Sequence, residues 1–454
     1  MGHEGHDDDD AYKHHSTYKL PSNTFFCFHS LFPTPAATQH HELAYDLHHR
    51  AHPDPHPQSH HHHHRPPRPP PPFLIDTFTH KTHNALGFWH GALEGLPLTH
   101  GPNSIRLSPT DPDQYYHTQL SAATCFNLNP HIHTNQHLHI HLSGSPHFTI
   151  SLTQNNPSCN ASLHPFPETW DSLDASRYAH NNHIYIPLSH FHINSSRTLS
   201  IAFGGFYTPE SVTLFRVEIV DAAAVPKAFP VPPRLDNGNV ALRCSRPGAF
   251  AFGIDDGQPG LAQEVMRILE EEGIMVTFFV VGMGLRDAET NFSAVYREML
   301  RRGHQVALHS DTHRKLEGLG STAEIDREIV ENIKSFQQIL GIETRYFRPP
   351  YGTIGARTRQ RLAYYIKDPQ IINWSVDIED WLWAGTKTPE KQREAFIRDV
   401  KLGGNLAVMH FLSPTTVSYF REIIQFVKSM NATIMRIDQC LEDPNSPPLK
   451  ISVP

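Results

Sequence analysis

From Asn237 to the end of the chain, short apolar runs alternate with segments that have the spacing of an amphipathic helix. The apolar runs are 249–254, 276–281, 305–308, 346–347, 371–376, 406–409 and 433–437. Segments 261–272 and 324–340 carry apolar residues at helical spacing, and the second ends at Gly341, a residue typical of a helix C-terminus. Strands that alternate with helices predict an α/β fold built on a parallel sheet or barrel.

The unusual polar groups in this region each follow directly after an apolar run, where a strand is predicted to end. The groups are Asp255-Asp256-Gly257, His309-Ser310-Asp311-Thr312-His313, Arg348-Pro349-Pro350-Tyr351-Gly352, Asp377-Ile378-Glu379-Asp380-Trp381 and His410. The carboxyl ends of parallel strands meet at one face of such a fold, and catalytic groups gather there. We therefore expect the five groups to share one site.

The residue types in these groups suit metal-assisted hydrolysis. Two imidazoles and a carboxylate form a ligand set for a divalent metal with an open position for water. Such a metal acidifies water and polarises a carbonyl. A second carboxylate remains to act as a base, and a separate histidine can protonate a leaving group. No Gly-x-Ser-x-Gly elbow occurs, which argues against a serine hydrolase.

The distribution of histidine supports the same hypothesis. The chain has 36 histidines, of which 16 lie in residues 1–72 and 16 lie between His80 and His192. Those that follow are His304, His309, His313 and His410. In a region almost free of histidine, three of these four belong to the polar groups that follow predicted strands, so composition alone does not explain their positions.

This region resembles the polysaccharide deacetylases with a NodB-type domain, the carbohydrate esterase group that includes fungal chitin deacetylases. The resemblance covers residues 240–441, and the five polar groups occur in the family's order. The run 276–282, Trp374 and the closing run 437–441 also match. The resemblance implies a distorted (β/α) barrel of NodB type and a metal-dependent hydrolase that removes N-acetyl groups from N-acetylglucosamine polymers, with chitin as the first candidate.

The resemblance also implies roles for individual residues. The metal ligands would be Asp256, His309 and His313, usually for Zn²⁺ or for another divalent transition metal such as Co²⁺. The catalytic residues would be Asp255 as the general base that activates water at the metal, Arg348 as its orienting partner, His410 as the general acid, and Asp380, which tunes His410. The substrate-binding residues would be Tyr351, whose backbone N–H holds the oxyanion, and Trp381 and Val408, which wall the acetyl pocket.

The sequence departs from the family pattern at three places. They are Gly253-Ile254 in place of the usual Thr-Phe, Gln258 between Gly257 and Pro259, and Phe411 in place of a frequent Asp. The first two changes predict a differently shaped loop. The alternative to an enzyme is a catalytically inactive carbohydrate-binding or cell-wall structural protein. We favour the enzyme, because a binding module has no use for both Asp255 and His410.

Composition divides the chain into expected domains at 1–72, 73–232 and 233–454. The first is rich in histidine and proline and has too few apolar residues to build a core, so we predict a disordered tail. The second has short runs rich in β-branched residues, separated by prolines and without long helical periodicity. It predicts an all-β sandwich in front of the deacetylase domain.

One predicted strand of the sandwich carries histidine at every second position. In the run 137–142, apolar side chains fall on one face and imidazoles on the other. A metal site on the imidazole face is one interpretation. We favour a solvated sheet face.

The cysteines suggest an oxidising compartment. The five are Cys27, Cys125, Cys159, Cys244 and Cys440, and no Cys-x-x-Cys occurs. The resemblance to fungal deacetylases implies a disulfide between Cys244 and Cys440, which would close a long ring. Cys125 and Cys159 are candidates for a further disulfide in the β-domain.

The remaining sequence features concern partners and location. A net charge of −8 argues against nucleic acid as a partner. No apolar stretch approaches the roughly 18–20 residues of a transmembrane segment. The Asn-x-Ser/Thr acceptors are Asn160, Asn194, Asn291, Asn373 and Asn431. We expect a secreted glycoprotein of the extracellular space or cell wall that acts on a polysaccharide, although residues 1–10 lack a signal-peptide pattern.

Overall fold

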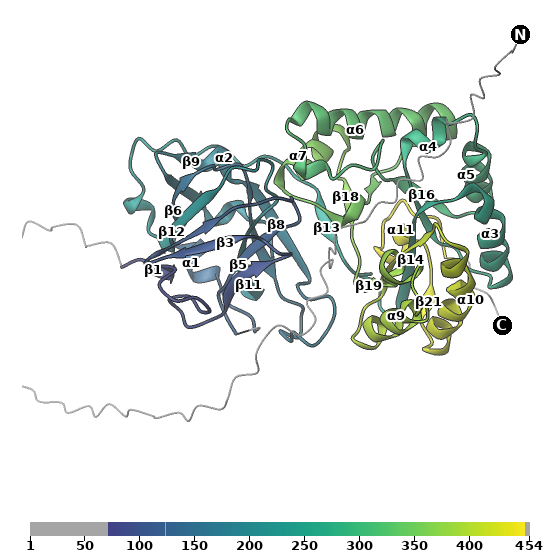
Figure 1. Ribbon diagram of the computed structural model, residues 1–454, viewed down its shortest axis with the longest axis horizontal. Coiled ribbons are helices and arrows are strands. Elements are labelled where there is room, and N and C mark those ends of the chain that lie inside the picture. The colour runs from purple at the N-terminus through teal and green to yellow at the C-terminus, as the bar shows by residue number, and fades with distance from the viewer. Residues whose placement is uncertain (1–70, 123, 450–454) are drawn as a thin grey trace, which may run out of the picture.

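The computed structural model describes residues 71–122 and 124–449 (Figure 1). Apart from its last two positions, the predicted disordered tail lies outside the described residues. A β-rich region extends from β1 (Phe73–Asp76) to β12 (Val212–Val220), and a region of alternating strands and helices begins at β13 (Asn239–Ala241). None of the helices in the described residues has the length and apolar character that a membrane span needs.

The β-rich region forms two antiparallel sheets within the described residues. The first has the spatial order β3 (Leu98–Gly101), β4 (Ser104–Leu107), β12, β6 (His137–Gly144), β10 (His183–Pro187) and β9 (Ala179–His180), with β1 beside β12. The second has the order β2 (His90–Leu93), β5 (Tyr115–Gln119), β11 (Thr198–Gly204), β7 (Thr149–Gln154) and β8 (Thr169–Asp174). Short helices are α1 (Asn129–His133) and α2 (Ala175–Tyr178). Tyr116 and Phe203 of one sheet share a core with Ile140 and Leu214 of the other.

The strand with alternating histidines forms as β6, but its imidazole face is not the solvated face that we expected. His137 and His139 are each only 8% exposed. Nδ1 of His139 lies 2.9 Å from a carboxylate oxygen of Glu218, and its ring stacks on Tyr185. Phe229, from the segment after β12, packs edge-on against Tyr185. The connection to the next region therefore covers part of this face.

The second region is built on a sheet whose paired strands run parallel, as the sequence predicts. In spatial order the strands are β13, β18 (Gln370–Ile372), β17 (Tyr346–Phe347), β16 (Gln305–Leu308), β15 (Thr277–Val280), β14 (Ala249–Gly257), β20 (Leu406–Phe411) and β19 (Val376–Asp377), with β21 (Thr433–Ile434) beside β14. In the part of the chain that the structure describes, β13 and β19 do not pair with each other. The sheet thus curls into an open half-barrel, which agrees with the expected distorted (β/α) barrel.

Helices pack around this sheet (Figure 1). They are α3 (Ala262–Glu271), α4 (Gly282–Arg286), α5 (Phe292–Arg301), α6 (Thr322–Ser335), α7 (Ala356–Tyr365), α8 (Asp380–Trp383), α9 (Lys391–Lys401), α10 (Pro414–Ser429) and α11 (Ile437–Cys440). A capping box of Ser321 and Glu324 starts α6. The helix continues as the π-helical turn η6 (Phe336–Leu340) and stops at Gly341, whose φ of 68° is left-handed.

One predicted strand is interrupted. The run 371–376 divides into the ends of β18 and β19, separated by residues that do not pair. The carbonyl of Asn373 accepts a hydrogen bond from the Arg348 guanidinium at 3.4 Å, and its side-chain amide donates to the Gly352 carbonyl at 3.1 Å. The backbone N–H groups of Asn373 and Ser375 still donate to the carbonyls of Ala241 and Leu406 at 2.9 Å, so this segment joins the two ends of the sheet.

Disulfides connect Cys125 to Cys159 and Cys244 to Cys440. The second joins residues 196 positions apart, at the two ends of the parallel-sheet region. A cross-link of this length lowers the entropy of the unfolded chain and so stabilises the fold. Cys27 lies outside the described residues.

Buried polar contacts join the two regions. Arg359 of α7 forms an ion pair with Asp171 of β8 at 3.1 Å and donates to the Trp170 carbonyl at 2.9 Å. Glu317, which is fully buried, accepts a hydrogen bond from the Thr149 hydroxyl of β7 at 3.2 Å. A buried charge is tolerated only with its partner in place, so these contacts fix one region against the other.

We expect the stability of the fold to decrease as the pH falls from about 6.5 toward 4, because buried His304 stays neutral. Its Nδ1 accepts a hydrogen bond from the backbone N–H of Val276 at 3.2 Å, and burial lowers its pKa to about 4. The unfolded chain binds this proton near pH 6.5 and the folded chain does not, which costs on the order of 1–3 kcal/mol at pH 4. Urea unfolding of the wild type and of His304→Gln at several pH values measures the difference. Equal slopes with pH in the two proteins would contradict the assignment.

Candidate active site

The polar groups predicted at strand ends lie together at the carboxyl edge of the parallel sheet. Asp255 and Asp256 lie near the end of β14, His309 follows β16, Arg348 follows β17, Asp380 begins α8 after β19, and His410 lies in β20. The strands run parallel, so their carboxyl ends lie at the same edge of the sheet. This topology brings together residues that are far apart in the sequence.

A candidate metal centre lies within this set. Asp256, His309 and His313 each offer one ligand atom, and these atoms lie within 4.8 Å of one another. Nε2 of His313 is 3.1 Å from Oδ2 of Asp256. His309 is 1% exposed, while Asp256 and His313 are half-buried, so the cluster is accessible from one side. Among the residues described, no other group of three such side chains gathers in this way.

The imidazole of His309 has the orientation of a metal ligand. Its Nδ1 is 2.7 Å from the backbone carbonyl oxygen of Arg348, so Nδ1 donates its hydrogen and the lone pair of Nε2 is left for a cation. Burial lowers the pKa of His309 to about 3, and the neutral form is the one that binds metals. Two imidazoles and one carboxylate are a donor set of catalytic zinc, so the residues fit such an ion.

Backbone strain is concentrated around the cluster. Left-handed φ values occur at Asp256 (44°), Ser310 (65°), His313 (60°), Tyr351 (61°) and Glu379 (53°). Such residues cost of the order of 1–3 kcal/mol each and persist only where their surroundings enforce them. The Ser310 hydroxyl oxygen, for example, accepts a hydrogen bond from the His313 N–H at 3.0 Å. The strain at candidate ligands indicates that their loops are held in place for a function.

Asp255 and Arg348 form a buried ion pair beside the cluster. Nη1 of Arg348 is 2.7 Å from Oδ1 of Asp255, and the guanidinium also donates to the Ile372 carbonyl at 3.1 Å. Burial raises the pKa of Asp255, while the charge of Arg348 opposes that shift. Oδ2 of Asp255 is 3.9 Å from Nε2 of His309. One oxygen is thus fixed and the other faces the cluster, which is the arrangement of a positioned base.

His410 is paired with Asp380. Its Nδ1 is 2.8 Å from Oδ1 of Asp380, and its backbone N–H donates to Oδ2 at 2.7 Å. Burial disfavours the charged imidazole, but the carboxylate of Asp380, helped by Asp255 and Asp256, outweighs burial and raises the pKa of His410 to about 10. The imidazole is therefore able to carry a proton at neutral pH, as a general acid must.

The residues expected to bind substrate take different places. The Tyr351 ring packs against His313 with centroids 4.7 Å apart. Trp381 is half-buried, and its backbone N–H donates to Asp380 at 2.8 Å. Val408 is 2% exposed and lies inside β20. Tyr351 and Trp381 thus adjoin the metal cluster and the candidate acid, whereas Val408 is part of the sheet.

Two departures from the family pattern have a structural reason. A side chain at Gly253 would overlap the guanidinium of Arg348. A side chain at Gly257 would overlap the ring of Phe411, which fills the space above the glycine. Gln258 donates its backbone N–H to the Phe411 carbonyl at 3.2 Å. The loop after the aspartate pair is therefore fastened to β20 through Phe411.

Two buried residues of α6 hold the loop of the histidines, and the sequence analysis missed them. Glu328 accepts hydrogen bonds from the backbone N–H groups of Asp311 and Thr312 at 3.1 and 2.8 Å. Asn332 accepts one from the N–H of His309 at 3.1 Å. The two are four residues apart and so share one helix face. The sequence signal that could have identified them is the presence of polar residues beside the apolar stripe of this helix.

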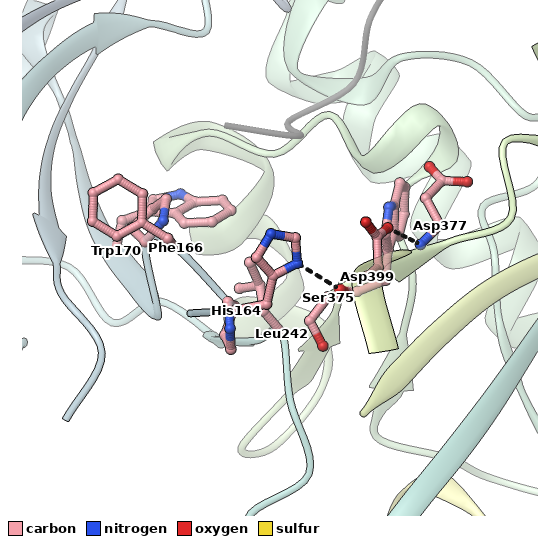
Figure 2. Close-up of a pocket in the computed structure, with 10 residues that line it drawn as sticks. His164, Phe166, Trp170, Leu242, Ser375, Asp377 and Asp399 are labelled. Atoms are coloured by element: carbon pink, nitrogen blue, oxygen red, sulfur yellow. Dashed lines mark hydrogen bonds between the residues drawn. The ribbon is translucent and has the colours of Figure 1, made fainter. Parts of the chain in front are cut away.

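A separate hollow lies between the two regions (Figure 2). His164, Phe166 and Trp170 of the β-rich region line it together with Ser375 and Asp377. Nδ1 of His164 is 3.2 Å from the Ser375 carbonyl oxygen. The hollow has a volume of about 30 Å³ and admits only a few water molecules, because one water needs about 10–15 Å³. The hollow contains none of the candidate ligands and is too small for a sugar.

The chain is similar in sequence to known proteins. Residues 243–365 match the family model described as polysaccharide deacetylase. The chain is 25% identical over 226 residues to a chitin deacetylase of Arthroderma benhamiae, which covers 48% of this chain and 58% of that protein. It is 29% identical over 195 residues to a peptidoglycan-N-acetylglucosamine deacetylase of Listeria monocytogenes. This match covers 42% of this chain and 38% of that protein. The chain therefore spans about half of the length of these relatives or less.

The chain is also similar to a solved structure. The chitin deacetylase of the fungal pathogen Colletotrichum lindemuthianum is 25% identical and has a TM-score of 0.43, over 47% of this chain and 95% of that one. The family match contains the candidate ligands, Asp255 and Arg348, and Asp380 and His410 lie after it. The family resemblance drawn from the sequence is confirmed.

Proposed function

Because the chain carries a polysaccharide deacetylase domain, we propose that it is a metal-dependent hydrolase that removes N-acetyl groups from N-acetylglucosamine polymers. The observation that carries the proposal is the metal-ligand cluster next to two paired titratable groups, Asp255 with Arg348 and His410 with Asp380. An amide is a poor electrophile with a poor leaving group. Its hydrolysis therefore needs a base, a site for the oxyanion and an acid.

The ligand residues and the base prepare the attack of water. A divalent ion such as Zn²⁺ or Co²⁺, held by Asp256, His309 and His313, would supply Lewis acidity toward water and the acetyl carbonyl. Asp255 accepts the proton of the attacking water through the oxygen that Arg348 leaves open. Burial raises the pKa of this carboxyl, and the charge of Arg348 opposes that rise.

The other residues act on the oxyanion and the leaving group. The backbone N–H of Tyr351 stabilises the oxyanion, since a fixed N–H dipole needs no reorganisation during the reaction. His410 gives its proton to the departing amine, and Asp380 keeps that proton available at neutral pH. Trp381 and Val408 border the space for the acetyl methyl group.

Chitin is the first candidate substrate. The relatives are named for chitin and for peptidoglycan N-acetylglucosamine, and both names refer to N-acetylated glycans. The alternative, a catalytically inactive carbohydrate-binding or cell-wall protein, has no need for an acid and a base held on one metal cluster. The paired Asp255 and His410 therefore favour turnover.

An extracellular or cell-wall location is consistent with a polysaccharide substrate. Disulfides persist in oxidising compartments. The exposed Asn-x-Ser/Thr acceptors are Asn160, Asn194, Asn291 and Asn431. Asn373 is 8% exposed and is committed to the interior. These features favour the secretory route for this chain.

We expect residues 71–454, loaded with zinc, to release acetate from chitin oligomers, and a chelator to stop the release. His309→Ala should lose both the bound zinc and the activity, because a cluster of two ligands binds the ion far more weakly. Zinc analysis and acetate assay of the same samples measure the two effects. The tail is omitted because His60 to His64 would bind zinc independently.

His304→Gln is the matched control, since it replaces a buried histidine outside the cluster and should leave the zinc content unchanged. Stoichiometric zinc in His309→Ala would contradict the ligand assignment. A zinc-loaded wild type that releases no acetate from any N-acetylglucosamine polymer would favour the binding-protein alternative.

A further inference from the structure

The loop between β4 and β5 of the β-rich region contacts the loops that carry His313 and Tyr351. Lys315 follows His313 by two residues, and Thr353 follows Tyr351 by two residues. Both of these side chains meet the same carboxylate, that of Asp113. A residue far outside the deacetylase domain thus lies one step from the candidate active site.

The contacts of Asp113 are short and buried. Nζ of Lys315 lies 2.5 Å from Oδ2 of Asp113 and 2.9 Å from Oδ1 of Asp111. The Thr353 hydroxyl donates a hydrogen bond to Oδ1 of Asp113. Asp113 is 8% exposed and Thr353 is 3% exposed. Each carboxylate oxygen of Asp113 therefore binds a different loop of the site.

The loop that presents Asp113 is itself braced. The backbone N–H of Asp113 donates to Oδ1 of Asp111 at 2.9 Å. The side chain of Gln114 accepts from the backbone N–H of Thr110 at 2.7 Å. These turns fix the carboxylate before it meets its partners, so less entropy is lost when the contacts form.

The two loops need such support. His313 and Tyr351 have φ values of 60° and 61°, which cost energy for residues with a side chain. Their rings pack together with centroids 4.7 Å apart, and Nζ of Lys315 lies 5.5 Å from the Tyr351 centroid. The ammonium of Lys315, from the loop of His313, therefore contacts the aromatic ring of the other loop, that of Tyr351. Movement of either loop would displace a ligand or the oxyanion site.

We propose that Asp113 is a positioning residue of the active site. Through Lys315 and Thr353 it holds the loops of the third metal ligand and of the oxyanion N–H. The β-rich region and the parallel-sheet region then form one catalytic unit, in which the first completes the site of the second. The roles assigned to His313 and Tyr351 rest on the proposed function, whereas the loop contacts themselves do not.

The test compares the full chain with Asp113→Asn, which removes the charge and keeps the size. We expect kcat for acetate release to fall about 10- to 100-fold with KM within about two-fold, since a misplacement of about 1 Å costs up to this much. Lys315→Met should act in the same way. The double variant should lose no more than Lys315→Met alone, because both changes remove the pair of Lys315 and Asp113. Lys315→Arg, which keeps the charge, should recover part of the rate.

Asp171→Asn is the matched control at the same interface. It breaks the buried ion pair with Arg359, which involves neither Lys315 nor Thr353, and should lower the unfolding temperature without changing kcat at temperatures where the protein is folded. A loss of kcat in Asp171→Asn equal to that in Asp113→Asn would show that docking of the regions alone matters, and would overturn the positioning role.

Hydrogen exchange by mass spectrometry tests the loops without reference to turnover. In Asp113→Asn, peptides that cover 309–318 and 346–354 should exchange faster, while peptides of β14 and β20 should not change. Unchanged exchange in both loops overturns the inference even in an active enzyme, as does faster exchange with wild-type kcat. A wild type without acetate release refutes the proposed function, and the exchange result then still decides whether Asp113 holds the loops.

Discussion

Replacement of His410 by alanine is expected to lower kcat by about 10²- to 10⁴-fold and to leave the zinc content unchanged. In the proposed mechanism His410 gives its proton to the departing amine, and none of the ligand atoms of the cluster belongs to it. Its bond to Asp380 at 2.8 Å orients the ring and raises its pKa to about 10. Acetate release and zinc analysis of residues 71–454 measure both quantities on one sample.

The control for this prediction is Asp380→Asn, which keeps the imidazole and removes the charge that raises its pKa. A general acid works while it is protonated, so activity decreases as the pH rises through its pKa. With a lower pKa at His410, the decrease should begin at a lower pH in Asp380→Asn than in the wild type. Loss of zinc from His410→Ala, or turnover above about a tenth of the wild-type rate, would contradict the role of acid.

The approximate strand ends were predictable from the sequence by two simple rules, although β14 and β20 extend past their apolar runs to Gly257 and Phe411. An apolar run of four to six residues marks a buried strand, and the first polar residue after it marks the end. Parallel strands place these ends on one edge, so Asp255, His309 and His410 converge although they are far apart in the chain. Three different strands thus supply the candidate metal ligands, the proposed base and the proposed acid.

Contacts between side chains and distant backbone groups were not predictable in this way. Glu328 and Asn332 act on the histidine loop only because α6 is rotated toward it, and hydrophobic periodicity does not fix that rotation to the level of a hydrogen bond. Asp113 and Lys315 meet across the contact between two regions. Sequence patterns describe each region by itself, and they contain no information on how the regions dock.

The imidazole face of β6 illustrates a related limit. Alternation shows which residues share a face of a strand, but it does not show what covers that face. His137 and His139 are buried although the pattern is typical of a strand with one solvated face. The Phe229 segment, which covers part of the face, follows β12 in the chain and gives no local signal in the run 137–142.

The second large effect is expected at Arg348, and it concerns stability. Arg348 is fully buried, and its guanidinium neutralises Asp255, which is 2% exposed. We expect Arg348→Met to lower the free energy of unfolding by about 3–5 kcal/mol, because removal of one partner leaves the other charge buried without compensation. Urea unfolding of the wild type and the variant at neutral pH measures this difference.

The double variant Arg348→Met with Asp255→Asn separates the charge from the packing. If the uncompensated carboxylate causes the loss of stability, the double variant should be more stable than Arg348→Met alone. Replacing both partners of a buried ion pair by neutral residues is often neutral or stabilising. If the double variant is no more stable, the cause is the loss of hydrogen bonds to the carbonyls of Ile372, Asn373 and Ala407. The first result would mean that the chain keeps a costly buried charge at Asp255 for catalysis, since a neutral pair at the same position would serve the fold better.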